Sequence, residues 1–160
     1  MPTGAGYHRA KAVKYAETWA FRRNPRYMNF DGMGGDCTNF ASQCLFAGCG
    51  VMNYTRGTGW YYIGPGNRAP AWSGVEFLYR FLVSNRGPGP YAVETEPSGL
   101  KPGDLVQLGA GGRFYHTPFV VSRAGGKILV AAHTFDAFAR PLSSYSYSAL
   151  RCLHIAGVRK

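Results

Sequence analysis

The chain has 160 residues and a net charge of +10, from 18 Lys and Arg residues against 8 Asp and Glu residues. This length is that of one domain with a core of its own, and no apolar run of about 18 residues is present that would predict a membrane span. The positive charge favours anionic surroundings, but the longest basic run is Arg22-Arg23, so no specific nucleic-acid stripe is expected. We therefore expect a single domain over residues 1–160.

Helical patterns dominate the first half of the chain. Apolar residues at helical spacing predict an amphipathic first helix that ends before Asn24-Pro25. The second helix has Asp36 as its expected N-cap and Gly48 as its C-cap. The third follows a capping box formed by Ser73 and Glu76. The three helices are expected over residues 8–23, 37–47 and 73–84.

The second half reads as β-structure. Glycine-rich turns separate short apolar or alternating segments, which is the pattern of antiparallel strands. Strands are expected over residues 104–108, 113–122, 127–132 and 151–157. Helices followed by an antiparallel sheet predict an α+β fold rather than alternating βαβ units.

Cys37 is the residue around which a chemical interpretation can be built. Gly34-Gly35 leads into it, Asp36 precedes it, and the predicted helix places it in the first turn. The N–H groups and the positive dipole end there would stabilise a thiolate. The alternative is a buried structural cysteine. Four cysteines are too few for a disulfide scaffold, and Cys37, Cys44 and Cys49 lack the close pairing of zinc ligands, so neither metal nor cofactor is expected.

A cysteine nucleophile needs a base, and that base needs an orienting group. His116 stands at the entrance to the most apolar strand, where the sheet would hold it rigidly. If the strands before and after residues 124–125 pair as a hairpin, His133 would lie opposite His116. Asp136 is the competing orienting residue, and we favour His133. The oxyanion site would use the N–H of Cys37 and a second donor, with Asp36 or the 24–35 loop nearby.

Aromatic side chains are concentrated in the glycine-rich segment 50–72. Trp60, Tyr61 and Trp72 are candidate substrate contacts on a mobile loop, together with Tyr115 beside His116. Packing over a satellite core is an equally weighted alternative for the aromatics of the 50–72 segment.

Several segments carry a resemblance to a bacterial domain family known as the “putative amidase” domain. The match runs over roughly residues 7–156, and its most specific part is Gly-Gly-Asp-Cys-Thr-Asn-Phe at residues 34–40. The family resembles papain-like and NlpC-like cysteine hydrolases, which implies a helix-borne cysteine packed on a sheet that carries histidine and a third polar residue. Transferred to this chain, these are Cys37, His116 and His133. The other matching segments are residues 7–16, 24–27, 102–107, the strand containing His116, and 133–142.

The resulting hypothesis is a metal-independent thiol hydrolase of amide or peptide bonds that acts through a thioester. The substrate would be a peptide, such as one attached to the anionic polymer peptidoglycan, and the protein a monomer. Two alternatives remain open: an acyltransferase or transpeptidase with the same chemistry, and a non-catalytic basic module that binds cell wall or nucleic acid. The compartment is left open as well, either inside the cell or at the wall if a leader or parent chain precedes the domain.

Overall fold

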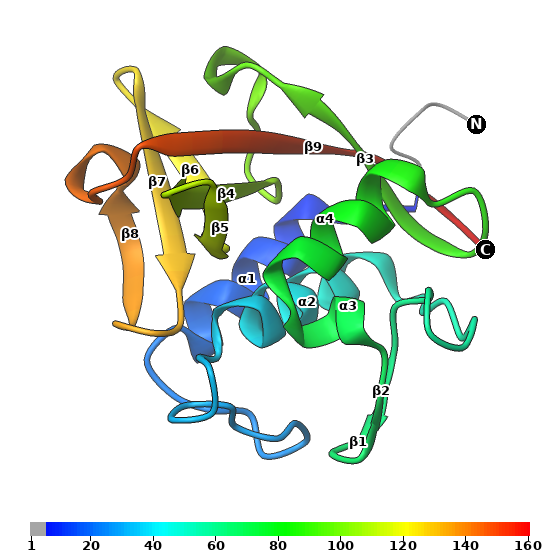
Figure 1. The fold of residues 1–160 in the computed structure, drawn as a ribbon. Coiled ribbons are helices and arrows are strands. Elements are labelled where there is room, and N and C mark those ends of the chain that lie inside the picture. Colours follow the sequence, from blue (N-terminus) through cyan, green and yellow to red (C-terminus); the bar gives the residue numbers. More distant parts are fainter. Residues whose placement is uncertain (1–5) are drawn as a thin grey trace.

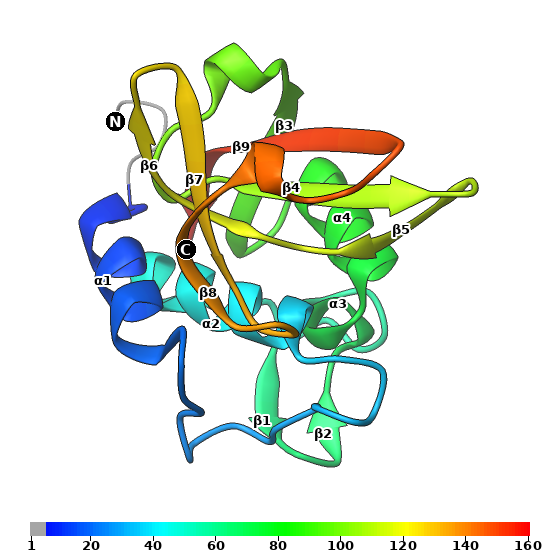
Figure 2. The ribbon, with the colours of Figure 1, turned by 90° about the vertical axis from the view of Figure 1, so that its left-hand side faces the viewer.

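Helices occupy the first half of the chain and an antiparallel sheet the second, as Figure 1 shows for the computed structural model, which describes residues 6–160. Figure 2 shows α1, α2 and α3 in a row below the sheet, with α2 in the middle. A small hairpin of β1 and β2 projects beyond them on the side away from the sheet. The elements of this half are α1 (Arg9–Trp19), α2 (Cys37–Cys49), β1 (Tyr62–Gly64), β2 (Asn67–Arg68), α3 (Pro70–Ser73) and α4 (Val75–Ser84).

The described part of the main sheet has seven strands in the order β3-β9-β4-β6-β7-β8, with β5 also pairing with β4. The long strand β9 lies between β3 and β4, so the end of the chain joins the edge strand β3 to the rest of the sheet (Figure 1). The elements are β3 (Gly89–Thr95), a 3-10 turn (Pro97–Gly99), β4 (Leu105–Ala110), β5 (Arg113–His116), β6 (Phe119–Ala124), β7 (Lys127–Ala132), β8 (Ala137–Pro141), a second 3-10 turn (Leu142–Ser144) and β9 (Ala149–Arg159).

The α+β prediction is confirmed, while the helix ends differ from the predicted ones. Helix α2 continues two residues further than expected and is capped by Gly50, whose φ of 68° is the left-handed conformation that glycine adopts without strain. Asp36 does precede α2, but its carboxylate makes no capping bond to the helix. The capping box at the third helix is also wrong. Ser73 ends α3 and accepts a hydrogen bond from Arg68, while Glu76 pairs with Arg151.

Among the strands, 127–132 is confirmed with its predicted bounds. The predicted strand 113–122 is two strands, because Pro118 cannot donate to a ladder and the chain bends at Thr117-Pro118. Strands β3 and β8 were not expected. The Gly-Pro-Gly-Pro pattern at residues 87–90 indicates a break, yet an edge strand tolerates proline, and β3 lies at the edge of the sheet.

Both faces of the sheet bury apolar side chains. The helices pack on one face, where Phe40 and Leu45 of α2 meet sheet residues such as Phe119 and Leu153. The other face carries a smaller cluster that includes Val106 and Val130, covered by the segments around Leu100 and Leu142. The nucleophile candidate Cys37 therefore begins the central helix of the larger core. Within residues 6–160, no helix combines the length and the apolar character that crossing a membrane requires.

Candidate active site

Cys37 is the first residue of α2 and lies beneath the sheet, with only 6% of its surface exposed. The first N–H groups of a helix have no acceptor within the helix, so the start of α2 presents backbone donors around the sulfur. All four cysteines are buried and none forms a disulfide. Burial and the absence of a disulfide therefore do not distinguish Cys37 from the other cysteines. Its contacts with the sheet distinguish it.

Two threonines join the start of α2 to the bend between β5 and β6. The hydroxyls of Thr38 and Thr117 lie 3.0 Å apart, and the Gln107 side chain donates to the Thr117 hydroxyl at 3.2 Å. The backbone amide of Thr117 is also within hydrogen-bonding reach of the Cys37 thiol, where it lowers the thiol pKa. Cys37 thus contacts the residue that directly follows His116, despite the intervening chain.

The protonation of Cys37 differs from the expectation of a primed thiolate. Burial raises the pKa of its thiol above the ordinary value, and the hydrogen bonds from Thr117 and Thr38 offset this only in part. Burial of the sulfur therefore favours the protonated thiol over the thiolate.

His116 ends β5, opposite Leu108 of β4, and its side chain is 8% exposed. It lines a cavity of about 450 Å³ that also contains Tyr115, Arg140 and Tyr145. Burial, together with the positive charge of Arg140, lowers the pKa of His116 to about 4. The imidazole is therefore neutral near pH 7, which leaves one ring nitrogen able to accept a proton.

Cys37 and His116 make no hydrogen bond to each other in the described structure, and the His116 ring has no hydrogen-bond partner there at all. His154, by contrast, is bonded to Asp104 through Nδ1 at 2.9 Å, and His8 is an exposed residue before α1. In residues 6–160, His116 is the one histidine that combines burial, a cavity and unengaged ring nitrogens.

His133 does not orient His116, and this expectation is corrected by the hydrogen bonds of its own ring. Its Nδ1 lies 2.5 Å from Asp36 Oδ2, and its Nε2 lies 2.8 Å from the Trp19 carbonyl oxygen. Both ring nitrogens are therefore engaged by partners other than His116. His133 is 1% exposed and stacks on Phe40.

The register of the β6–β7 hairpin explains the misplacement. Phe119 pairs with Ala131, which on extension places Thr117, not His116, opposite His133. The expected register is one residue off, and a shift of one residue turns a side chain to the other face of a sheet. The Thr117 hydroxyl does contact the helix side, as the bond to Thr38 shows.

Asp136 does not contact His116 through a hydrogen bond either. It accepts two from Arg23, at 3.1 and 2.9 Å, and Arg23 also pairs with Asp31. The same guanidinium lies 3.7 Å from Asp36. Burial would raise the pKa of Asp36, but hydrogen bonds from His133, Asn39 and the Phe30 backbone outweigh it and lower that pKa. These ion pairs and hydrogen bonds connect the segment after α1, the 24–36 loop and the segment after β7.

The predicted aromatic contacts divide into two groups. Trp60 and Trp72 are fully buried core residues whose indoles donate to Ser42 and Asn39, so the expectation that they touch substrate is wrong, and the packing alternative holds. Tyr61 is partly exposed but packs against Tyr54, away from the His116 cavity. Tyr115 is 45% exposed and lines that cavity.

Comparison with known proteins identifies the group to which this site belongs. A family model described as “Putative amidase domain” matches residues 6–155. The chain belongs to this family. No solved structure matches the chain.

Two proteins of Bacillus subtilis (strain 168) are similar to this amidase-family chain. “Uncharacterized protein YhbB” is 38% identical over 139 residues, which cover 81% of the chain and 42% of that protein. “Uncharacterized protein YjcM” is 31% identical over 138 residues, which cover 81% of the chain and 31% of that protein. The chain therefore spans less than half the length of these relatives.

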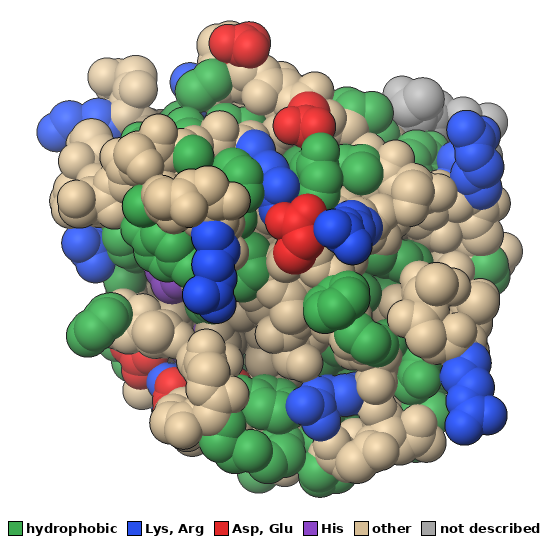
Figure 3. Space-filling view, in the orientation of Figure 1, with side chains coloured by type: hydrophobic (Ala, Val, Ile, Leu, Met, Phe, Trp, Pro, Cys, Tyr) green, Lys and Arg blue, Asp and Glu red, His purple; other side chains and the backbone are tan. Residues whose placement is uncertain are grey.

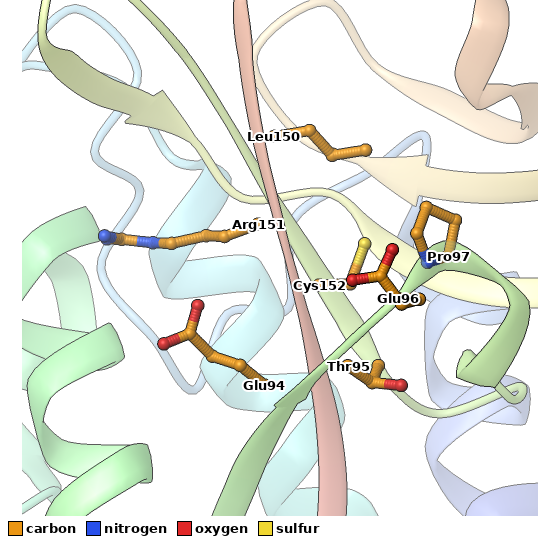
Figure 4. A pocket seen from close by; sticks show the side chains of 7 residues that line it. All are labelled: Glu94, Thr95, Glu96, Pro97, Leu150, Arg151 and Cys152. Atoms are coloured by element: carbon orange, nitrogen blue, oxygen red, sulfur yellow. The ribbon is translucent and has the colours of Figure 1, made fainter.

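A second cysteine of this amidase-family chain, Cys152, also borders a cavity, but its surroundings differ from those of Cys37. Figure 4 shows this other cavity, of about 430 Å³, where Cys152 lies near Glu96 and Pro97 while Arg151 points to the opposite side of β9. Burial, with the charges of Glu96 and Asp104, raises the pKa of Cys152 to about 11. No histidine lines this cavity, so its thiol has no imidazole base at hand.

Three residues that frame the site were not assigned from sequence. Thr117 could have been suspected from its place between His116 and Pro118. Arg140 lies in a segment that carries the family resemblance, but nothing in the pattern shows that it faces His116. Tyr145 stands in a serine- and tyrosine-rich stretch without period, and its ring centroid lies 5.6 Å from that of His116. Only the folded chain brings the last two to the cavity.

Proposed function

We propose that this amidase-family chain is a cysteine hydrolase of amide bonds, with Cys37 as nucleophile and His116 as base in a papain-like arrangement. The observation that carries the proposal is the 3.0 Å contact between the hydroxyls of Thr38 and Thr117, because it fixes the residue after Cys37 against the residue that follows His116. The family description supports the reaction class, and the helix-first order of elements fits a cysteine on a helix packed against a sheet.

The reaction divides into two transfers of an acyl group. The Cys37 sulfur attacks the substrate carbonyl carbon while its proton passes to His116, and the imidazolium then gives this proton to the departing amine. The carbon–nitrogen bond breaks and a thioester is left. Water next attacks the thioester as His116 takes one of its protons, and the returning proton restores the Cys37 thiol as the acid leaves.

The resting site has neutral partners, which sets what the substrate must do. A thiol with a raised pKa and an imidazole with a pKa of about 4 do not form an ion pair on their own. Catalytic hydrogen bonds are often long in free enzymes and tighten in the substrate complex. We therefore place proton transfer from Cys37 to His116 in the substrate complex, at the moment of attack.

The oxyanion of the tetrahedral intermediate would lie at the start of α2. The N–H of Cys37 is a first-turn donor without an acceptor in the helix, and such donors stabilise developing negative charge. The substrate on either side of the scissile amide has room in two hollows that share Tyr115. One is the His116 cavity, and the other, of about 590 Å³, is lined by Gly34, Phe77 and Phe114 among others.

The candidate substrate is a cell-wall peptide. The net charge of +10 favours an anionic polymer such as peptidoglycan with its attached anions, and the two hollows beside Tyr115, of about 590 and 450 Å³, offer room for peptide side chains. The protein is proposed to act as a monomer.

The test is turnover and thioester trapping with muropeptide digests and a synthetic peptide-amide library. Replacing Cys37 by Ala is expected to remove turnover, and acid quench of the wild-type protein to reveal an acyl adduct on Cys37 by mass spectrometry. Cys49→Ala is the matched control, because Cys49 lies at the other end of α2 with the same 6% exposure.

Turnover that survives in Cys37→Ala, with the fold intact by circular dichroism, would refute the nucleophile assignment. A competing amine in the assay distinguishes hydrolysis from acyl transfer, since a transferase forms the new amide and a hydrolase releases the acid.

A further inference from the structure

The cavity that contains His116 has a cation with no acidic partner. Arg140 comes from β8 and is partly buried, and its guanidinium lies over the Tyr145 ring at 3.7 Å from the centroid. Two of its nitrogens donate to Ser144, Nε to the hydroxyl and Nη2 to the carbonyl. Within residues 6–160, no carboxylate pairs with Arg140, so its positive charge is uncompensated in the cavity.

Other partly buried arginines of the fold provide a comparison. Arg9, Arg23 and Arg151 each pair with at least one carboxylate at 2.9 Å or less. Arg68, like Arg140, pairs with no carboxylate in residues 6–160, but it lies over Phe30 and lines none of the cavities described here, whereas Arg140 lines the His116 cavity. Desolvating a guanidinium without a counter-charge is costly, so an unpaired arginine in the wall of a cavity is well explained by an anion that arrives from outside.

A hydroxyl without a partner lies beside the same cavity. Tyr145 lines the cavity, and its hydroxyl oxygen is buried without a protein hydrogen bond of acceptable geometry in the described chain. Buried polar atoms are almost always bonded in folded proteins. The phenol can donate to an anion that is held by Arg140, and the two groups are already in contact through the stacking of Arg140 on the ring.

The rim of the cavity adds an apolar contact under strain. Phe135 is 86% exposed and has a φ of 61°, and its neighbour Thr134 has a φ of 60°. Left-handed backbone is unfavourable for residues other than glycine, and such strain gathers at ligand sites. Thr134 is held by a hydrogen bond from the Asp36 backbone N–H, so the rim is attached to the residue before Cys37.

We propose that this cavity is a substrate subsite for a carboxylate, held by Arg140 and the Tyr145 hydroxyl, with an apolar group of the same substrate against Phe135. The substrate class is then an amide whose leaving or acyl part carries a free carboxylate next to an apolar side chain. The assignment of the anion to a substrate, rather than to another ligand, rests on the proposed amidase function.

The subsite also explains why His116 is uncharged when no substrate is bound. The charge of Arg140 contributes to the low pKa of His116. A carboxylate bound to Arg140 neutralises that charge, so it raises the pKa of His116 and makes the imidazole a stronger base. Substrates without the carboxylate would leave the base weak, which converts anion recognition into catalytic selectivity.

The binding test uses Cys37→Ala protein, which cannot turn over, and N-acetylalanine in both enantiomers, with N-acetylalaninamide as the neutral probe. The His116 ring proton is followed by NMR. We expect saturable shifts with N-acetylalanine, at least tenfold weaker binding of the amide, and an upward move of the His116 titration midpoint. Arg140→Gln is expected to weaken carboxylate binding at least tenfold, and Arg140→Lys less, because it keeps the charge and loses the planar fork.

The control is Arg86→Gln, the same substitution at an exposed arginine that lines none of the cavities described here, which is expected to keep carboxylate binding unchanged. Equal binding of acid and amide, or full binding by folded Arg140→Gln and Arg140→Lys proteins, would overturn the subsite. Carboxylate binding without any amide cleavage or thioester in the wild-type protein would instead refute the proposed function and leave the anion site standing.

A kinetic comparison tests the same point in the active protein. Peptide pairs that differ only in a free carboxylate or a carboxamide are cleaved by wild-type protein and by the variants. The wild type is expected to favour the carboxylate at least tenfold in kcat/KM, and Arg140→Gln to lose that preference while Arg86→Gln keeps it. Retention of the preference in Arg140→Gln counts against the subsite.

Discussion

At the scale of single residues, the site depends on how burial changes two titrating groups. Cys37 and His116 are both nearly covered, and in each case the loss of water favours the uncharged form. The sequence pattern points to the helix dipole, a short-range effect of the first turn. It cannot show that the sheet covers the sulfur, and this covering decides the sign of the shift.

The reactivity of Cys37 with iodoacetamide follows from its raised pKa. We expect slow labelling of the resting protein at pH 7 and a rate that still increases above pH 9, because only the thiolate reacts. Peptide mapping by mass spectrometry at a series of pH values measures this. Fast labelling that levels off below pH 7 would show that the thiolate is already formed at rest.

The His116 imidazole links pH to the free energy of unfolding. Its pKa is about 4 in the folded protein, below the ordinary 6.5, so the unfolded chain binds the proton first as pH falls. Stability from this group is complete above about pH 6.5 and is lost progressively down to about pH 4, by about 3 kcal/mol in all. Urea unfolding of wild type and His116→Gln between pH 7 and pH 4 isolates this contribution, since acidic groups such as Asp36 are common to both proteins. Parallel pH curves would contradict it.

At the scale of elements, the joint between α2 and the β5–β6 bend holds the site together. Thr38 and Thr117 connect a helix start to a strand end, and Gln107 of β4 donates to the same hydroxyl. Gln107 also donates to the Val75 carbonyl at the start of α4, so this one side chain connects the sheet with two helices. The geometry of Cys37 and His116 depends on this joint.

Replacing Thr117 by Val removes the hydroxyl but keeps the shape of the side chain. Thr38 and Gln107 would then lose a buried partner, which is expected to lower the free energy of unfolding by about 2 kcal/mol and to lower kcat more than it raises KM. Thr18→Val is the control, because the Thr18 hydroxyl is exposed and bonds only within its own helix. A stability change no larger than that of the control would argue against the joint.

The pair of Asp36 and His133 is a second joint, between the loop before α2 and the end of β7. His133→Asn is expected to destabilise the protein by roughly 3 kcal/mol, because a buried carboxylate loses a hydrogen-bond partner. It is expected to leave amide turnover by the folded protein unchanged, in contrast to His116→Asn, which would remove turnover while costing little stability. Thermal unfolding and turnover measurements on both variants decide between a structural and a catalytic His133.

How far the sequence predicts these elements follows from what each pattern contains. Residues 127–132 form an apolar segment between two clear turns, which predicts the strand that is observed. The glycine pair before Asp36 and Cys37 indicates the start of a new element, and a helix does begin at Cys37. Strand β8 has no periodic pattern, and its Ala139 has a φ of 56°. The residue opposite His133 could not be predicted, because the hairpin turns at Gly125-Gly126 rather than at residues 124–125, and because the register shifts between Val120 and Ser122.

At the scale of the whole molecule, charge and length set the context of the site. Figure 3 shows Lys and Arg side chains scattered between hydrophobic groups on one face, without a continuous basic stripe. Such a surface suits attraction to an anionic polymer more than sequence-specific recognition of a nucleic acid. The chain covers less than half of the length of the Bacillus subtilis proteins to which it is similar.

Retention on an anionic wall polymer is expected to depend on salt. With a net charge of +10, binding to isolated wall sacculi should fall roughly tenfold or more between about 50 and 200 mM salt, through displacement of counterions, and Cys37→Ala should bind as the wild type does. A sedimentation assay with neutral chitin as the reference polymer measures this. Salt-independent retention would mean that charge does not direct the domain to the wall.

The covering of Cys37 has a consequence for the durability of the protein. Peroxide and oxygen-derived oxidants attack cysteines in the thiolate form, and sulfenic acid forms where such a sulfur is open to solvent. A protonated sulfur beneath the sheet, with 6% of its residue surface exposed, is a poor target. The proposed nucleophile is therefore expected to survive in oxidising surroundings while the site is empty, and to become vulnerable only during the interval in which its proton has passed to His116.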